Sequence, residues 1–426
     1  MPTQWHVRSG SGGAPRSKPF YLVDPPLTTS IQTKKRPDAL LVANLMAQLA
    51  FGLFAMTICL PSMQEWGAIF DAGQASVQLT FSGFLVAYGV LQLIYGPLSD
   101  RVGRKKVLML GMTIAFIGSL MAALAPTLTW LIWGRIVQGA GAAAGMVVGR
   151  AMVQDLFEGP ERTRVMAFVG MVMGLCPPLA TIVGGQLHVQ LGWRANFVVI
   201  ATMVALLLVA AWRGLPSHNT VNAVQTHWLQ TMLSSYLALL KEPLFLLYVA
   251  ILAMGTATFY AFLGGAPIVL GSYGVKPDGI GFYIMVVPCS YIAGSYLTSR
   301  IVLRMGNRRM MQLGQGVTLS SVVLVLLLAL AGLNSPLAFV MPLMLFGLGQ
   351  GLLVPPVLAA TVGLRPMLAG SAAAVAGVTQ QLLGALGGFA VGLFPHNGAT
   401  NLGWLMLGLT LVGVVAQWFL HTKEPL

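Results

Sequence analysis

Two long apolar runs of this chain are joined by the stretch Gly96–Val107, which reads Gly-Pro-Leu-Ser-Asp-Arg-Val-Gly-Arg-Lys-Lys-Val. Its two glycines permit a tight turn, because glycine adopts backbone angles that are costly for other residues. Its basic side chains hold the turn on the cytoplasmic side of a membrane, where loop Arg and Lys are enriched. The stretch therefore predicts a short cytoplasmic loop between two membrane-spanning helices, with one acid, Asp100, at the end of the first.

The composition excludes a soluble domain. Of 426 residues, 56% are hydrophobic and 8% charged, and the mean hydropathy is +0.79, so charged residues are too few to form a polar surface. Apolar runs that approach the roughly 20 residues of a bilayer-spanning helix lie near 39–61, 76–98, 107–125, 129–149, 164–187 and 195–212. A second set lies near 244–270, 279–299, 310–332, 337–359, 370–393 and 402–420. We predict an all-α integral membrane protein with about twelve transmembrane helices in two pseudo-symmetric halves of six.

The position of the charges accounts for the net charge of +13. If the N-terminus is cytoplasmic, all of the 24 Lys and Arg residues except Arg135, Arg194 and Lys276 fall on cytoplasmic segments. The basic residues therefore set the topology, with both termini in the cytoplasm. Nucleic-acid binding is not indicated, because no basic patch is interleaved with exposed aromatic residues.

An intramembrane enzyme is the alternative from another class of protein. Catalysis would need a clustered nucleophile, a metal site or an acid pair, but neither His-Glu-x-x-His nor Gly-x-Ser-x-Gly occurs and the histidines are scattered. The cysteines Cys59, Cys176 and Cys289 lie within or at the end of apolar runs, where they serve as small packing residues. We therefore expect no enzymatic activity, no metal site and no cofactor.

Two polar segments divide the chain. Residues 1–37 are rich in Ser, Gly, Pro and basic residues and have no helical period, so they predict a disordered cytoplasmic tail. The longest later polar interruption predicts a cytoplasmic linker over 214–242, in which apolar residues recur at the spacing of an amphipathic helix. This linker separates an N-terminal six-helix half, 38–213, from a C-terminal half, 243–426.

The two halves share an internal repeat. The basic loop Arg101–Lys106 recurs as Arg304–Arg309, and the Gly-Gly pair at 184–185 recurs at 387–388 with the same offset. Parallel six-span repeats predict a substrate path at the midplane between the halves. Only the first copy of the loop has the acid, because Leu303 stands where Asp100 would be.

The loop at Gly96–Val107 resembles the signature loop between the second and third spans of major facilitator superfamily transporters. The flanking stretches, Gln78–Tyr88 and Leu91–Pro97, resemble the Bcr/CflA branch of drug/proton antiporters, whose members confer resistance to bicyclomycin and chloramphenicol. The resemblance covers most of residues 38–200 and extends weakly into the second half. It implies a monomeric transporter of the bacterial inner membrane that exports lipophilic small molecules in exchange for protons, by alternating access.

The resemblance gives the loop a gating role. In the family, the acid contacts the N-terminal end of the eleventh helix, here near Gly370, and a helix N-terminus attracts a carboxylate. Breaking that contact would open the cytoplasmic side. The basic residues could equally be simple topological anchors. The gating candidates are Gly96, Asp100, Arg101, Gly103 and Arg104.

Arg135 opens the run 135–145 in the fourth apolar stretch and matches the family's second motif. An arginine within a span is costly unless it faces a polar interior, so a functional role is expected. Two interpretations stay open. In the first, Arg135 takes part in a proton relay or contacts the substrate. In the second, it is an interhelical hydrogen-bond clamp.

The fifth span resembles the motif that the family associates with exporters. Glycines on one face allow close packing, and prolines remove backbone donors and bend the span. The motif favours antiport over the alternative of an uptake permease, while a metabolite exporter stays open. Its residues are Gly170, Gly174, Pro177, Pro178, Gly184 and Gly185.

All carboxylates map to loops or span ends, which leaves the proton site open. Many relatives carry an aspartate in the first span, where this chain has Thr57. Asp155 is the first substitute, followed by Asp38 and Asp100, although Asp155 could instead be a helix-end residue paired with a neighbouring Arg.

The substrate cavity is expected to be apolar with a few polar points. Because no carboxylate lies in mid-span and Arg135 adds positive charge, neutral or weakly anionic amphiphiles should be preferred over cations. Each lining candidate could also be a packing residue. The candidates are Phe51, Phe54, Tyr88, Gln92, Tyr260, Tyr291, Gln380 and Gln381.

Overall fold

The computed structural model describes residues 39–216, 228–395 and 398–423. These residues form helices and no strand. The predicted tail, 1–37, lies outside the described residues, as does part of the predicted linker.

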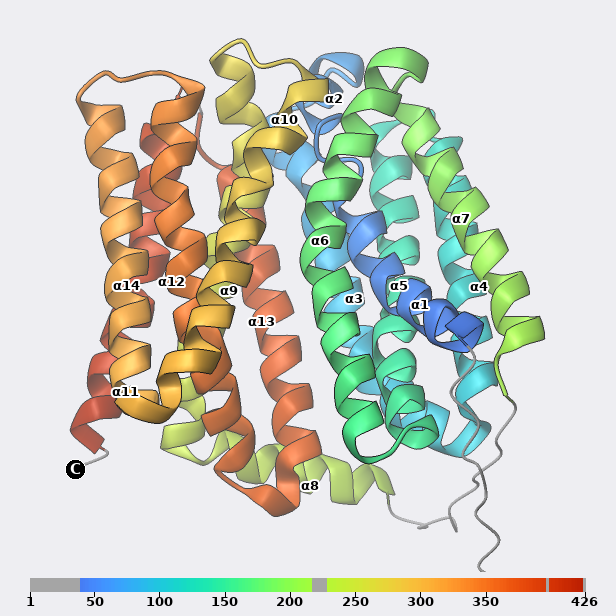
Figure 1. The fold of residues 1–426 in the computed structure, drawn as a ribbon. Coiled ribbons are helices and arrows are strands. Elements are labelled where there is room, and N and C mark those ends of the chain that lie inside the picture. The colour runs from blue at the N-terminus through green and yellow to red at the C-terminus, as the bar shows by residue number, and fades with distance from the viewer. Residues whose placement is uncertain (1–38, 217–227, 396–397, 424–426) are drawn as a thin grey trace, which may run out of the picture. The chain divides into compact units, whose positions relative to one another are not determined.

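The helices form a first and a second set, joined by a helix that lies across one end of the bundle (Figure 1). The first set consists of α1 (Ala39–Thr57), α2 (Met63–Ile69), α3 (Gln74–Val102), α4 (Arg104–Ala123), α5 (Leu128–Leu156), α6 (Gly159–Leu191) and α7 (Trp193–Gly214). The joining helix is α8 (Trp228–Leu240). The second set consists of α9 (Pro243–Ser272), α10 (Pro277–Ile284), α11 (Val286–Leu330), α12 (Pro336–Gly363), the 3₁₀ turn η1 (Pro366–Leu368), α13 (Ala369–Val391) and α14 (Thr400–Lys423).

The expected spans are present. Ten described ranges are long and apolar enough to cross a membrane. One of them, Pro277–Leu330, holds two spans, because Gly306 interrupts α11 with non-helical backbone angles. With α6, which covers the predicted run 164–187, the described helices supply all twelve spans. The prediction of an all-α membrane protein with twelve spans in two sets is confirmed.

The two ends of the bundle differ in charge. We call the end with the turns at Gly103, Phe157–Glu158 and Gly306 the basic end, and the end with the turns at 58–73 and Tyr273–Lys276 the opposite end. Figure 1 shows α8 and the C-terminal end of α14 at the basic end, and α2 and α10 at the opposite end. Leu239 of α8 is buried among residues of α9 and α13, so α8 is anchored to the second set.

The internal repeat of the sequence is also a repeat of structure. Gly103 and Gly306 have φ angles of 104° and 78°, a region that favours glycine, so the same residue makes the same turn in both loops. A side chain at Gly184 would collide with the backbone of Ile58, and one at Gly387 would collide with that of Ala257. In each set, the fifth span therefore packs through glycine against the first.

Within the first set, glycines also let α4 and α5 touch backbone to backbone. A side chain at Gly141 would meet backbone atoms of Gly111 and Ala115, and one at Gly118 would meet the backbone of Gln138. Such close approach supplies dispersion contacts between helices whose association gains little from the hydrophobic effect in lipid.

The two sets meet along α3 with α13 and along α6 with α10. The contacts are tight at the opposite end, where Gly392 lies against Ala75 and Gly281 lies against Ile182. Toward the basic end they loosen. Gly96 is close to Val147 of its own set, and no atom lies within 4 Å of where a side chain at Gly370 would begin.

We predict that Gly141→Ala destabilises the protein by about 1–3 kcal/mol, because the added methyl group has backbone on its far side and cannot be accommodated by side-chain movement. The matched control is Gly408→Ala in α14, where nothing lies within 4 Å of the added atom. Thermal unfolding of the purified protein in detergent would measure both. Equal midpoints for the two variants would contradict the packing described here.

Candidate functional site

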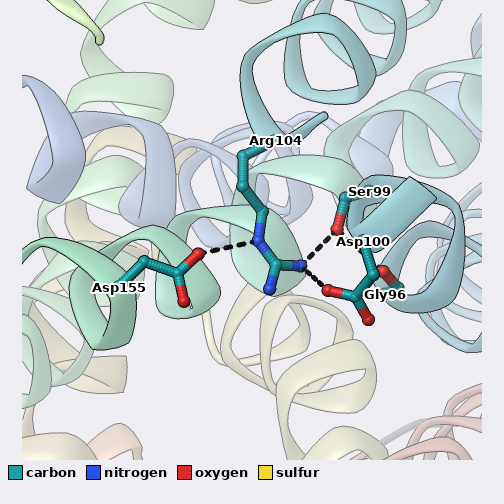
Figure 2. Close-up of polar contacts among 5 residues, drawn as sticks. All are labelled: Gly96, Ser99, Asp100, Arg104 and Asp155. Atoms are coloured by element: carbon teal, nitrogen blue, oxygen red, sulfur yellow. Dashed lines mark hydrogen bonds and ion pairs between the residues drawn. The ribbon is translucent and has the colours of Figure 1, made fainter. Parts of the chain in front are cut away.

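A cluster around Arg104 links three helices at the basic end (Figure 2). Arg104 is the first residue of α4, and its Nε donates to Asp155 Oδ2 of α5 at 3.0 Å. Its Nη1 donates to Ser99 Oγ of α3 at 2.7 Å and also pairs with Asp100. The Ser99 hydroxyl in turn donates to the carbonyl of Gly96 at 2.7 Å. One guanidinium therefore holds the ends of α3 and α5 together.

Two acids that the sequence analysis treated separately thus share a single partner. Asp100 and Asp155 both bind Arg104, which matches the interpretation of Asp155 as a helix-end residue paired with a neighbouring Arg. The expected contact of Asp100 with the start of α13 is not among the contacts described, because Arg104 holds the carboxylate on its own side and the space at Gly370 is open.

Lys105 has a specific role that was not predicted from the sequence. Its ammonium donates to the carbonyls of Trp212 and Leu215 at 2.7 and 2.8 Å. These two carbonyls belong to the end of α7 and the residue after it, which lack partners further along the helix. Lys105 therefore caps α7 and fixes it to α4. The sequence signal was only a basic loop, which does not specify the acceptor.

Arg135 lies in α5 with no exposed surface. Its Nη1 donates to the carbonyl of Ala55 at 2.7 Å and to the side-chain oxygen of Gln138, and its Nη2 donates to the carbonyl of Met56 at 3.2 Å. The guanidinium also reaches the carbonyl of Thr80 on α3 at 3.4 Å and lies 4.4 Å from the ring centre of Phe84.

These contacts form an interhelical clamp. Helix α1 ends at Thr57, and its last carbonyls have no partner within the helix. Arg135 satisfies two of them and ties α1 to α3 and α5. Among the described residues no carboxylate pairs with Arg135. Of the two interpretations left open by the sequence, this geometry favours the clamp.

The fifth-span motif in α6 faces both sets. Gly184 lies against the end of α1, whereas Gly185 lies against Pro277 of α10 in the second set. Gly174 lies near Ile292 of α11, and Gly170 lies in α6 one turn earlier. Pro177 and Pro178 are inside the helix, where each removes a backbone donor, and the Thr181 hydroxyl donates to the carbonyl of Pro177 at 2.8 Å. The motif therefore forms a contact surface between the sets.

Four of the cavity candidates lie together where α3, α9 and α13 meet. The Tyr260 hydroxyl donates to Gln381 Oε1 at 3.2 Å, and Gly89 lets α3 approach the side chain of Gln381. Gln92 lies near Gly377 of α13. Tyr88 packs against Gly52 of α1, and its buried hydroxyl has no hydrogen-bond partner among the described residues.

The other four candidates lie apart from this group or show no polar contact with it. Phe51 is fully buried in the core, and Phe54 packs against that core. Tyr291 of α11 lies where α11 passes the glycines of α12. Gln380 is half-buried on α13.

Two glutamines, neither singled out from the sequence, hydrogen-bond across the two sets at the opposite end. Gln78 of α3 is fully buried and donates to the carbonyl of Gly264 on α9 at 3.0 Å. Gln64 of α2 donates to the carbonyl of Pro267 on the same helix. We call these two contacts the glutamine latch. In the sequence, each glutamine is only an amide near or within an apolar run. Its hydrogen-bond partner lies in the other half of the chain, so the sequence does not indicate the contact.

One further pair of ionisable groups was also missed. The Nε2 atom of His188 in α6 lies 3.0 Å from Glu65 Oε2 of α2, and the imidazole is buried while the carboxylate is half exposed. The pair lies one turn beyond the contact of Gly185 with α10.

Comparison with known proteins places this geometry in a family. The profile of the Major Facilitator Superfamily matches residues 40–388. Multidrug resistance protein D of Escherichia coli (strain K12) is 28% identical over 387 residues, which cover 90% of this chain and 95% of that protein. A chloramphenicol resistance protein of Pseudomonas aeruginosa is 29% identical over 393 residues, covering 88% and 91%. The resemblance expected from the sequence motifs is confirmed.

A solved structure of a D-xylose-proton symporter has a TM-score of 0.72 and 15% sequence identity, and it covers 91% of this chain and 98% of its own. At this identity the likeness concerns the fold alone.

We predict that Arg135→Lys destabilises the protein by about 3 kcal/mol, because a single ammonium cannot reach the carbonyls of α1 and α3 and the amide of Gln138 together. Arg194→Lys is the control, since Arg194 is exposed and donates to one carbonyl, that of Ala125. Thermal unfolding of the purified variants would measure the difference. An Arg135→Lys protein as stable as the control variant would rule out the clamp.

Proposed function

Because the chain belongs to the Major Facilitator Superfamily, we propose that it is a secondary active transporter that exports small amphiphilic drugs across the bacterial inner membrane in exchange for protons. The observation that carries this proposal is the similarity, along nearly the whole chain, to relatives named for multidrug and chloramphenicol resistance. The fold supplies what such transport needs, which is two sets of spans that meet along a central contact.

The proposal includes an orientation. Loops rich in Arg and Lys favour the cytoplasmic side, so the basic end, with Arg104, Lys105 and Arg308, is cytoplasmic, and both termini lie on that side. The opposite end is then periplasmic. Since the sets are tightly packed at the opposite end and loosely packed at the basic end, the described conformation is inward-facing. The transporter acts as a monomer, because one chain supplies both sets.

Alternating access then consists of exchanging one closed end for the other. To face outward, the protein must break the glutamine latch and the contacts of Gly185 and Gly281 at the periplasmic end. In exchange, the cytoplasmic ends of α3 and α13 must approach each other. Asp100 lies in the last turn of α3, and the start of α13 offers a carboxylate a helix N-terminus.

We call the four cavity candidates that lie where α3, α9 and α13 meet the central group, and their side chains suit uncharged substrates. Tyr88, Gln92, Tyr260 and Gln381 carry hydroxyl and amide groups, and no carboxylate of the described residues lies among them. A permanent cation would lose its hydration there without gaining an anion in return. From the sequence, the positive charge of Arg135 was expected to disfavour cationic substrates. Its guanidinium is instead fully buried and bound to carbonyls, so it does not contribute to this preference.

Proton exchange has two candidate sites. Asp155 is bound to Arg104 in this conformation. Closure of the cytoplasmic end would change the surroundings of this pair. A proton could bind to Asp155 or leave it at that step. His188 with Glu65 is the second site, because the buried imidazole lies against a carboxylate that is half exposed. An uptake permease is the alternative on the same fold, since fold does not fix function. The fifth-span motif and the named relatives favour export.

We expect vesicles that contain the purified protein to transport chloramphenicol when a pH gradient is imposed, and to transport it much more slowly without one. Tetraphenylphosphonium should be a poor substrate, because its charge has no carboxylate partner among Tyr88, Gln92, Tyr260 and Gln381. Asp155→Asn or His188→Gln should abolish the response to the gradient, whereas Asp71→Asn, an exposed change at the opposite end, should not. Transport that is indifferent to the gradient would remove the proton from the proposal, and strong transport of tetraphenylphosphonium alone would remove the preference for neutral drugs.

We expect Asp100→Asn to insert and fold normally, because Arg104 keeps Ser99 and Asp155 as partners. It should weaken cytoplasmic closure about two- to fivefold, the change that about 0.3–1 kcal/mol of helix-terminus interaction gives. A cysteine placed at Ser371 in a Cys289→Ser background would measure this, since Cys59 and Cys176 are buried. Its labelling from the cytoplasmic side should rise in Asp100→Asn and stay unchanged in Asp71→Asn. Equal labelling in the two variants would argue against a gating role for Asp100.

A further inference from the structure

A cleft on the outer surface of the second set carries polar groups that neither the fold nor transport explains. It lies between the part of α11 that follows Gly306 and the C-terminal part of α14, and its volume is about 280 Å³. Its polar lining consists of Gln312, Gln315, Gln417 and His421. The neighbouring surface is apolar and exposed, with Leu313, Trp418 and Phe419, as expected of a face that meets lipid.

Two hydrogen-bond acceptors in this lining are buried without partners. His421 Nδ1 lies 2.8 Å from the carbonyl of Gln417, so Nδ1 carries the hydrogen and Nε2 is left as an acceptor. That Nε2 atom is buried and has no hydrogen-bond partner in the described part of the chain. The same holds for the side-chain oxygen of Gln417, whose side chain is 5% exposed. Buried acceptors without donors are costly, so a ligand that brings two donors would be favoured.

The charge around the cleft indicates what else the ligand carries. Arg308 donates from Nη2 to the carbonyl of His421 at 3.2 Å, which brings a guanidinium to the basic end of the cleft. Arg304 and Arg309 belong to the same loop. Among the described residues no carboxylate lines the cleft, so they offer an ammonium group no counter-charge. The site fits an anionic phosphate beside Arg308 and neutral hydroxyl donors toward Gln417 and His421.

We propose that this cleft binds the head group of a phosphatidylglycerol lipid from the leaflet at the basic end. The two hydroxyls of its terminal glycerol donate to Gln417 Oε1 and His421 Nε2, and its phosphate lies next to Arg308. Its acyl chains lie along the apolar surface beside Trp418. Basic pockets between membrane helices are an established type of anionic-lipid site, and here the buried acceptors add selectivity for a hydroxyl-bearing head group.

The test is native mass spectrometry of the full-length protein in detergent, with phosphatidylglycerol, phosphatidylethanolamine or phosphatidylcholine of identical acyl chains added. Wild type should retain phosphatidylglycerol best. Gln417→Leu and His421→Leu should each weaken that retention about fivefold, the loss expected for one hydrogen bond. His421→Gln keeps an acceptor near the position of Nε2 and should retain most of the binding. Gln190→Leu, the same change at an exposed position of α6, is the control and should have no effect.

A second variant separates loss of the site from loss of the fold. Gln417→Glu has the same shape but puts a negative charge beside the head group, so it should reverse the preference toward phosphatidylethanolamine, a gain that an unfolded protein could not show. Equal retention of the three lipids by wild type, or unchanged retention of phosphatidylglycerol in the Leu variants, would each overturn the proposal.

Discussion

The buried guanidinium of Arg135 is the interaction on which the first set of helices depends. A helix that ends in the apolar interior of a protein leaves its last carbonyls without donors, and each unsatisfied group is costly. Helix α1 ends in this way at Thr57, before the turn that leads to α2. Arg135 supplies the missing donors from α5 and reaches α3 as well. Burying the guanidinium alone would be costly, and so would leaving the carbonyls at the end of α1 without donors. Their hydrogen bonds remove both costs.

Some features of the fold could be predicted because the sequence carries a local signal for each of them. Each span is set by the length of an apolar run, and the two loops of the repeat are set by Gly103 and Gly306, whose backbone angles other residues adopt at a cost. These signals are local, so one sequence is enough to find them. Arg135 also gave a local signal, the cost of its burial, but two interpretations remained because its backbone acceptors lie on other helices.

The features that sequence reasoning missed involve contacts between distant residues. Arg104 and Asp155 are 51 residues apart, and Gln78 and Gly264 are 186 apart. Nothing in a run of residues indicates which of many helix ends will lie opposite a given side chain. Amides give the weakest signal, because Gln64 and Gln78 carry no charge that would make their position in an apolar run stand out. Asp100 was expected to reach the second set, but its own loop already offered it a closer cation.

The chemistry of the glutamine latch also has a consequence for the surroundings in which a bacterium lives. Ion pairs weaken as salt rises and change with acidity, whereas hydrogen bonds between amides and carbonyls respond little to either. With the opposite end facing outward, as we propose, the described polar bonds that join the two sets there are neutral, while the ionic cluster around Arg104 faces a cytoplasm whose composition the cell regulates. The amide bonds of the outer seal would then be as strong in brine as in fresh water, and the barrier against leakage of ions would not depend on the salt outside.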